Sequence, residues 1–261
     1  MTTALITGAT AGIGAEFASQ LAGQGYDLVL VARDASRLAE RAASLQHEFG
    51  VRVEALPADL LDPAGLDSVA ARLQERRRPI GLLINNAGYG ERGALHENTV
   101  EQEKRHLDIH VSAPLRLTQA ALGGMLERGS GRIVLISSVA AFTPRGTYAA
   151  AKAWGVTFAR GANLAYRDRG VSVTAVCPGF VHTEFHERME VSTTGIPAFL
   201  WLDAPRVVRL ALRGIQRGRS VVIPTLRYRV ISGLARVLPD RVAGSGGFRS
   251  GGDRDAGERR G

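Results

Sequence analysis

The sequence predicts an α/β fold in which a doubly wound parallel sheet of about seven strands carries helices on both faces. Short apolar, β-branched segments alternate with longer segments whose apolar residues recur with a helical period. The short segments are apolar along their whole length, as expected for parallel strands that are buried on both faces. Strict alternation of strand and helix is typical of such a sheet. The predicted strands span residues 4–7, 26–32, 51–56, 81–85, 132–137, 171–176 and 220–224.

The segments between the strands have the amphipathic pattern of surface helices. In the segment 35–49, Leu38, Ala42 and Leu45 share one helical face, and Arg41 lies on the opposite face. These helices are therefore expected to pack one side against the sheet.

The chain has 261 residues, of which 45% are hydrophobic, which is enough for one large domain with a full core. We expect a single domain over residues 1–240. The apolar, Gly- and Pro-interrupted insertion 184–203 breaks the alternation and is predicted to be a substrate lid. Residues 241–261 are rich in Gly, Ser and Arg without periodicity and are predicted to be a disordered tail.

The net charge of +8 comes almost entirely from arginine, because only Lys104 and Lys152 are lysines. The basic clusters at 75–79 and 249–261 do not predict a nucleic-acid partner, since the first closes a predicted helix and the second mixes both signs. The single cysteine, Cys177, cannot form an internal disulfide and is expected to be buried. With no leader-like start and no long apolar run, the sequence predicts a cytoplasmic protein.

A glycine-rich turn follows the first predicted strand, in the stretch "TGATAGIG" that contains Gly8, Gly12 and Gly14. Glycines at this place let the backbone turn sharply and approach a pyrophosphate, whose charge is stabilised by the amides of the following helix. A tight turn in another α/β fold is the alternative.

The end of the second strand indicates which dinucleotide binds. An acidic residue there would bind a ribose 2′-hydroxyl and repel a 2′-phosphate. The chain has Ala32 followed by Arg33, whose guanidinium suits a phosphate, so NADP(H) is predicted over NAD(H). Asp34 and the neutral Ala11 in the glycine turn argue against this, and Arg33 as an ordinary surface residue is the alternative.

Tyr148 and Lys152 lie one helical turn apart in "YAAAK". A nearby ammonium and the positive ring of an oxidised nicotinamide would lower the pKa of the phenol, which makes it an acid/base. Ser138 ends a buried strand, where its hydroxyl could donate to a substrate oxygen that gains negative charge. An ordinary helix pair and a serine that satisfies the strand end are the alternatives.

Together, "TGATAGIG", "NNAG" at 85–88, "ISS" at 136–138, "YAAAK" at 148–152 and "CPGF" at 177–180 resemble the short-chain dehydrogenase/reductase family over residues 2–225. The resemblance implies a Rossmann-type sheet, NAD(P)-dependent interconversion of alcohol and carbonyl, and assembly into homo-oligomers. It implies Tyr148 as acid/base, Ser138 as the group that polarises the substrate oxygen, and Lys152 as the ligand of the nicotinamide ribose. The implied cofactor-binding residues are Gly8, Gly12, Ile13, Gly14, Arg33, Asp59, Leu60, Asn86, Ala87, Gly88, Tyr148, Lys152, Pro178, Gly179, Val181 and Thr183.

The chain departs from the family pattern at two places. His110 in "LDIHVSAP" stands where members usually have an asparagine that helps to hold a water between the lysine and solvent. A histidine there is a candidate catalytic residue whose proton relay would depend on pH near its pKa of about 6.5, or it is a helix residue satisfied by backbone. The span from Ser138 to Tyr148 is shorter than in many members, which alters the mouth of the substrate site more readily than the chemistry.

A histidine pair and a C-terminal apolar stripe are two further features of the sequence. His182 and His186 lie one turn apart, but Glu184 does not fit the H-E-x-x-H arrangement, so no metal site is predicted. In 225–240, an apolar stripe of Leu226, Val230, Leu234 and Val237 is expected to pack against the domain or a second subunit, with a pocket cover or a membrane-surface contact as alternatives.

The apolar run Phe199–Leu202 in the insertion suggests a hydrophobic carbonyl or alcohol substrate, although these residues could equally form the core of the lid. A dinucleotide-binding scaffold without activity is the rival function, since a fold hosts many functions.

Overall fold

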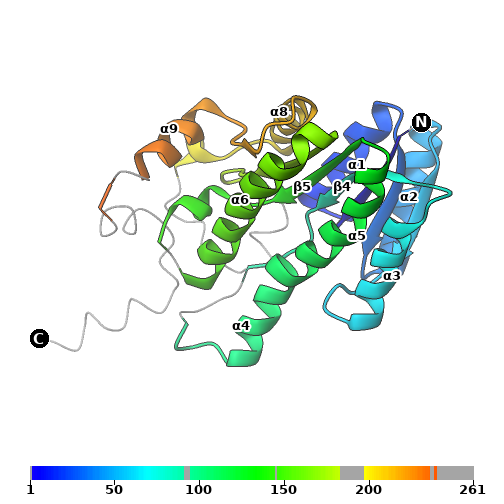
Figure 1. Cartoon of the computed structure of the whole chain (residues 1–261). Helices are drawn as coiled ribbons and strands as arrows, with labels where there is room; N and C mark the ends of the chain where they lie inside the picture. Colours follow the sequence, from blue (N-terminus) through cyan, green and yellow to red (C-terminus); the bar gives the residue numbers. More distant parts are fainter. Residues whose placement is uncertain (1, 91–94, 145, 183–196, 236–237, 240–261) are drawn as a thin grey trace, which may run out of the picture.

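The computed structural model describes residues 2–90, 95–144, 146–182, 197–235 and 238–239. Its centre is one seven-stranded sheet in the order β3-β2-β1-β4-β5-β6-β7, in which every pairing is parallel (Figure 1). The strands are β1 (Thr3–Thr7), β2 (Asp27–Ala32), β3 (Val53–Pro57), β4 (Ile80–Asn85), β5 (Gly131–Ile136), β6 (Val171–Val176) and β7 (Val221–Val222). All seven predicted strands are confirmed, with ends shifted by one or two residues.

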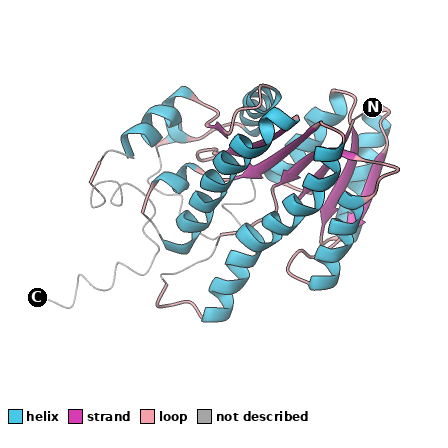
Figure 2. Ribbon diagram, in the orientation of Figure 1, coloured by secondary structure: helices cyan, strands magenta, loops and turns pink. Residues whose placement is uncertain are grey.

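Helices cover both faces of the sheet, and Figure 2 shows the resulting three layers. One face packs against α1 (Gly12–Gly23), α2 (Ala35–Phe49) and α8 (Ala204–Gln216), and the other against α3 (Pro63–Gln74), α5 (Ala113–Glu127) and α6 (Gly146–Tyr166). The remaining helices are α4 (Val100–Leu107) and α9 (Leu226–Ala235), with a π-helical segment η1 (Asp108–Ser112) and the short 3-10 turns η2 (Val139–Phe142), η3 (Arg167–Arg169) and η4 (Ala198–Leu200).

The core consists of two apolar layers that the sheet separates. In β1, Leu5 faces the layer under α3, α5 and α6, whereas Ala4 and Ile6 face the layer under α1 and α2. Because successive side chains of a strand point to opposite faces, both layers need apolar residues, which explains the continuous apolar runs in the sequence. In α2, Leu38, Ala42 and Leu45 are the buried residues, as the helical periodicity predicts.

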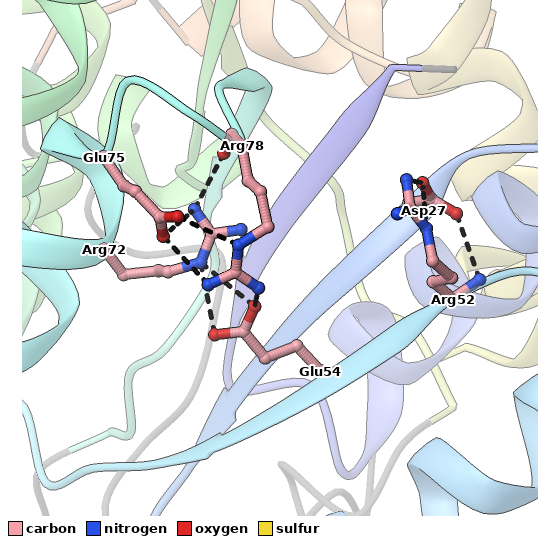
Figure 3. Close-up of polar contacts among 6 residues, drawn as sticks. All are labelled: Asp27, Arg52, Glu54, Arg72, Glu75 and Arg78. Carbon is pink, nitrogen blue, oxygen red and sulfur yellow. Dashed lines mark hydrogen bonds and ion pairs between the residues drawn. The ribbon is translucent and has the colours of Figure 1, made fainter.

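Ion pairs hold the β2–β3 side of the sheet (Figure 3). The buried carboxylate of Asp27 accepts hydrogen bonds from the backbone N–H, Nε and Nη2 of Arg52, at 3.0, 3.1 and 2.6 Å. In a separate group, the guanidinium of Arg72 is only 7% exposed and lies 3.1 Å from Glu54 and 3.5 Å from Glu75. Arg78, which follows α3, bridges the same two carboxylates and so belongs to this network.

The sheet order reverses between β1 and β4, and ligands of open α/β sheets bind at the carboxyl ends of the strands beside such a switch point. This edge carries the glycine turn after β1, the "NNAG" segment after β4 and Ser138 after β5. The predicted tail lies outside the described residues, as does most of the insertion. Among the described residues, no helix has the length and hydropathy that crossing a bilayer requires.

Candidate active site

The glycine turn leads from β1 into α1 in the way a dinucleotide site requires. Gly8 and Gly12 adopt φ values of +66° and +56°, which favour glycine. A Cβ on Gly14 would lie 2.2 Å from the carbonyl oxygen of Gly8, so only glycine lets the helix approach the turn this closely. Ala11 caps α1 without a side-chain hydrogen bond, so no capping side chain covers the first amides of the helix. The turn therefore fits a pyrophosphate.

Asn86 ties the glycine turn to the end of β4. Its Nδ2 donates to the carbonyl oxygens of Thr7 and Gly8, at 2.9 and 3.1 Å. The hydroxyl of Thr7 accepts hydrogen bonds from the backbone N–H groups of Asn86 and Ala87, both at 3.0 Å. These bonds place the predicted ribose-flanking segment beside the predicted pyrophosphate turn.

Arg33 is exposed at the end of β2. The carboxylate of Asp34, which argued against a 2′-phosphate, accepts a hydrogen bond from the backbone N–H of Arg37 at 3.0 Å and caps α2. Because the carboxylate of Asp34 caps α2, a ribose hydroxyl is not needed to account for it. The acidic residue therefore argues less strongly against NADP(H) than the sequence indicates. Asp59 and Leu60 follow β3 on the same edge, and a carboxylate oxygen of Asp59 accepts from the N–H of Leu61 at 3.0 Å.

Tyr148 and Lys152 lie together near the start of α6. Nζ of Lys152 is 5.5 Å from the centroid of the Tyr148 ring and donates a hydrogen bond to the carbonyl of Ile136 at 2.9 Å. The hydroxyl of Ser137 donates to the backbone carbonyl of Lys152 at 2.7 Å. These two bonds fasten α6 to the end of β5.

Ser138 completes this group. Its hydroxyl oxygen accepts a hydrogen bond from the N–H of Ala140 at 3.1 Å, which starts the turn η2. The hydroxyl also forms a hydrogen bond with Tyr148. The structure thus brings together Ser138, Tyr148 and Lys152, which the sequence placed on two separate elements.

The electrostatics of the pair differ from the sequence-based expectation. Burial raises the pKa of Tyr148 to about 12, and only the hydrogen bond with Ser138 acts in the opposite direction. Burial also lowers the pKa of Lys152 to about 8, and Cys177 opposes this shift. In the protein alone, desolvation of the phenolate dominates, so the expected lowering by the ammonium and an oxidised nicotinamide together stays a prediction.

His110 lies in the π-helical segment η1, 6% exposed. Its Nε2 is 2.6 Å from the carbonyl oxygen of Tyr89, and because a carbonyl only accepts, Nε2 carries the proton. Burial, followed by the Lys152 ammonium, lowers the pKa of His110 well below 6.5. The predicted pH dependence near 6.5 is therefore wrong: the ring stays neutral at physiological pH. The ring also explains Gly88, whose Cβ would lie 2.3 Å from Cε1 of His110.

Sequence reasoning missed His106, which is fully buried in α4. Its ring centroid lies 4.5 Å from that of His110 and 5.9 Å from that of Tyr148. The available signal was the spacing of the two histidines, one helical turn apart on the same face. Burial lowers the pKa of His106 as well, so two neutral imidazoles lie against the phenol.

A cavity of about 20 Å³ lies next to Lys152. The residues that line it include Asn85, His110, Ser137 and Lys152. Its size is sufficient for one water molecule. Within the described part of the chain, Oδ1 of Asn85 is buried without a hydrogen-bond partner, so a water in this cavity would find an acceptor there.

The "CPGF" segment follows β6 and approaches the serine loop. The N–H of Val139 donates to the carbonyl of Pro178 at 3.0 Å, and Cys177 is fully buried, as predicted. Val181 pairs with Leu202 in an isolated parallel bridge. Thr183, Glu184 and His186 lie outside the described residues, and the ring of His182 stacks on Trp201 with centroids 4.5 Å apart. The described residues hold no group of three metal-ligating side chains.

The structure rules out one of the two packings expected for the apolar stripe of α9, the one against the domain. The stripe of Leu226, Val230 and Leu234 does not pack against the domain, since these side chains are 72, 54 and 54% exposed. The buried residues of α9 are Tyr228 and Ser232. Val237 lies outside the described residues, and a second subunit or a membrane surface on this stripe stays a prediction.

The chain is similar to known proteins over most of its length. Residues 2–192 match the short chain dehydrogenase family. Oxidoreductase UcpA of Salmonella typhimurium is 36% identical over 189 residues, which cover 71% of each chain. A short-chain dehydrogenase from Sphingobium yanoikuyae, solved in complex with NADPH, is 40% identical with a TM-score of 0.83 and covers 90% of this chain and 93% of that one.

A bulky-bulky ketone specific alcohol dehydrogenase from Comamonas testosteroni is 34% identical with a TM-score of 0.78, over 92% of this chain and 95% of that one. The resemblance drawn from the motifs is thus confirmed over most of the chain. The chain belongs to the short-chain dehydrogenase family and is an oxidoreductase of that family.

Proposed function

We propose that this enzyme interconverts ketones that have hydrophobic substituents and the matching secondary alcohols, with NADP(H) as cofactor. The observation that carries the proposal is the assembly of Ser138, Tyr148 and Lys152 at the carboxyl edge of the sheet, beside the glycine turn. A pure nucleotide-binding protein has no need for a buried phenol and a buried ammonium at this place.

NADP(H) is the cofactor because Arg33 is exposed at the end of β2 while Asp34 caps α2. The relative from Sphingobium yanoikuyae, solved with NADPH, supports the same cofactor. Gly8, Gly12, Ile13 and Gly14 would hold the pyrophosphate, and Asp59 and Leu60 would contact the adenine. Asn86, Ala87 and Gly88 would flank its ribose, and Pro178, Gly179, Val181 and Thr183 would hold the nicotinamide end.

When bound, the reduced cofactor would supply the hydride. Ser138, Tyr148 and Lys152 would provide the proton and stabilise the charge that develops on the substrate oxygen. The hydroxyl of Ser138 accepts from a backbone N–H and forms a hydrogen bond with Tyr148, and its proton would turn to the substrate oxygen when substrate binds. With a pKa of about 12, Tyr148 is protonated at neutral pH and can donate to the oxygen as negative charge develops on it. Lys152 adds positive charge beside the phenol.

A hydrophobic substrate is supported by aromatic side chains before the insertion and near its C-terminal end. The rings of Phe180 and Trp201 lie 5.9 Å apart, and Phe199 is 66% exposed. The relative from Comamonas testosteroni is named for bulky ketones, which agrees with a substrate of this kind.

The test is Tyr148→Phe, with NADPH consumption followed against a panel that runs from acetone to aryl alkyl ketones. We expect the wild type to consume NADPH faster with the larger, apolar ketones, and the variant to lose turnover while its affinity for NADPH stays within about twofold. Unchanged turnover would refute the role of Tyr148. Tight NADPH binding without turnover on any ketone would favour the rival, a regulatory or scaffold protein.

We also propose that the enzyme is a homo-oligomer. The outer faces of α5 and α6 support this, because Leu115 is 45% and Leu164 85% exposed there. Light scattering would measure the assembled mass. The cytoplasmic location stays a prediction from the sequence.

A further inference from the structure

Tyr228 connects α9 to two other parts of the chain. Its side chain is 2% exposed and packs in a small cluster with Val181, Leu202 and Val207. Its hydroxyl donates a hydrogen bond to the carbonyl of Leu200 at 2.7 Å and accepts one from the N–H of Phe180 at 3.2 Å. One hydroxyl thus bridges the segment after β6 and the turn η4.

The ring of Tyr228 also lies on the backbone of Gly179. A Cβ on Gly179 would lie 2.1 Å from Cε2 and Cζ of the ring, so any other residue would displace either the ring or the backbone. The requirement for glycine at this position therefore comes from the tyrosine.

The backbone that Tyr228 contacts is joined to the catalytic group. The carbonyl of Pro178 accepts from the N–H of Val139, the residue after Ser138. The N–H of Leu202 donates to the carbonyl of Phe180 at 2.8 Å, and the N–H of His182 donates to the carbonyl of Leu202 at 3.1 Å. A shift of residues 178–181 would therefore also move the backbone next to Ser138.

We infer that Tyr228 is a positioning residue that holds residues 178–181 in the arrangement that binds the nicotinamide end of the cofactor. This inference rests on the proposed function. Without the hydroxyl, the N–H of Phe180 and the carbonyl of Leu200 lose their shared partner, and a smaller fraction of molecules keeps the binding arrangement. The apparent Kd of a ligand rises as the competent fraction falls, but only for ligands that contact this backbone.

The experiment compares two ligands on three proteins by calorimetry. NADPH would reach the nicotinamide segment 178–181, whereas 2′-phospho-ADP-ribose lacks the nicotinamide and would bind through its adenine, 2′-phosphate and pyrophosphate groups alone. Tyr228→Phe removes one hydroxyl and keeps the ring. Tyr166→Phe, at the far end of α6, makes the same chemical change elsewhere.

We expect Tyr228→Phe to raise the Kd for NADPH about threefold to tenfold, the effect of one hydrogen bond, and to leave the Kd for 2′-phospho-ADP-ribose unchanged. Tyr166→Phe should change neither. Gly179→Ala places a Cβ 2.1 Å from the ring of Tyr228 and should give the same selective loss of NADPH affinity. This second variant keeps the inference testable if Tyr228→Phe folds poorly.

Two results would overturn the inference. An unchanged Kd for NADPH in Tyr228→Phe would show that the hydroxyl does not position the nicotinamide segment. Equal weakening of both ligands would show a general loss of structure instead. If wild-type protein binds 2′-phospho-ADP-ribose and NADPH equally poorly, the cofactor proposal itself fails and this inference fails with it.

Discussion

Replacing Arg33 by alanine tests the choice of cofactor directly. A hydrogen bond to a charged group contributes about 1.5–3 kcal/mol, and the exposure of Arg33 places its contact with a 2′-phosphate at the lower end, because water screens exposed charges. Since 1.4 kcal/mol is a factor of ten, the Kd for NADPH should rise about tenfold. The Kd for NADH, which lacks the 2′-phosphate, should stay nearly constant.

Fluorescence titration with NADPH and NADH gives both constants, and the loss for NADPH should shrink at high salt. Asp34→Ala is the matched control on the adjacent residue. It removes the cap of α2, which costs about 1 kcal/mol and lowers Tm by about 2–4 °C, but it should leave the ratio of the two constants unchanged. An unchanged ratio in Arg33→Ala, or a large increase in NADPH affinity in Asp34→Ala, would refute the assignment of these two residues.

Two further predictions concern the turn and the sheet. Gly14→Ala places a Cβ 2.2 Å from the carbonyl oxygen of Gly8, so its affinity for NADPH should fall more than about tenfold. The control is Gly23→Ala in the same helix, where the nearest atom to the added Cβ is 3.4 Å away, and it should bind NADPH normally in the same titration. Normal NADPH binding by both variants would contradict the role of the tight turn. Arg52 holds the pKa of Asp27 below its usual value of 3.8, so this carboxylate stabilises the fold fully above that value and progressively less as pH falls through the lower, folded pKa. Urea unfolding from pH 7 to pH 3 should therefore show a steeper loss of stability at the acidic end in the wild type than in Asp27→Asn, and parallel curves would count against the ion pair.

The sheet could be predicted from the sequence because each of its strands is buried on both faces. Strands in that environment need continuous apolar runs. The glycines after β1 are recognisable because the turn packs too closely against its neighbours to leave room for a Cβ. The π-helical segment around His110 could not be predicted, because a change of hydrogen-bond pattern over five residues leaves the apolar periodicity nearly intact. His106 was missed for the related reason that its burial depends on packing against Tyr89 and Tyr148.

The C-terminal helix shows a different limit. A stripe of leucine and valine predicts a buried face, but the structure exposes that stripe and buries the face with Tyr228 and Ser232. Periodicity identifies the two faces of a helix and does not say which one the domain covers. The contact of Tyr228 with Gly179 settles it, and this contact joins residues far apart in the chain.

Tyr148 shows why the chemistry of a pair cannot be read from its spacing alone. The sequence shows that Tyr148 and Lys152 lie one helical turn apart, and a nearby ammonium favours the phenolate. It does not show the burial of Tyr148, which favours the neutral phenol and is the larger effect. With its pKa raised from 10.0 to about 12, the phenol of Tyr148 is held in the protonated form at neutral pH. The protein by itself thus keeps Tyr148 ready to donate a proton, as reduction of a carbonyl requires. Oxidation of an alcohol needs the phenolate, which the positive charge of an oxidised cofactor would have to favour against burial. We therefore expect carbonyl reduction to be faster than alcohol oxidation at neutral pH.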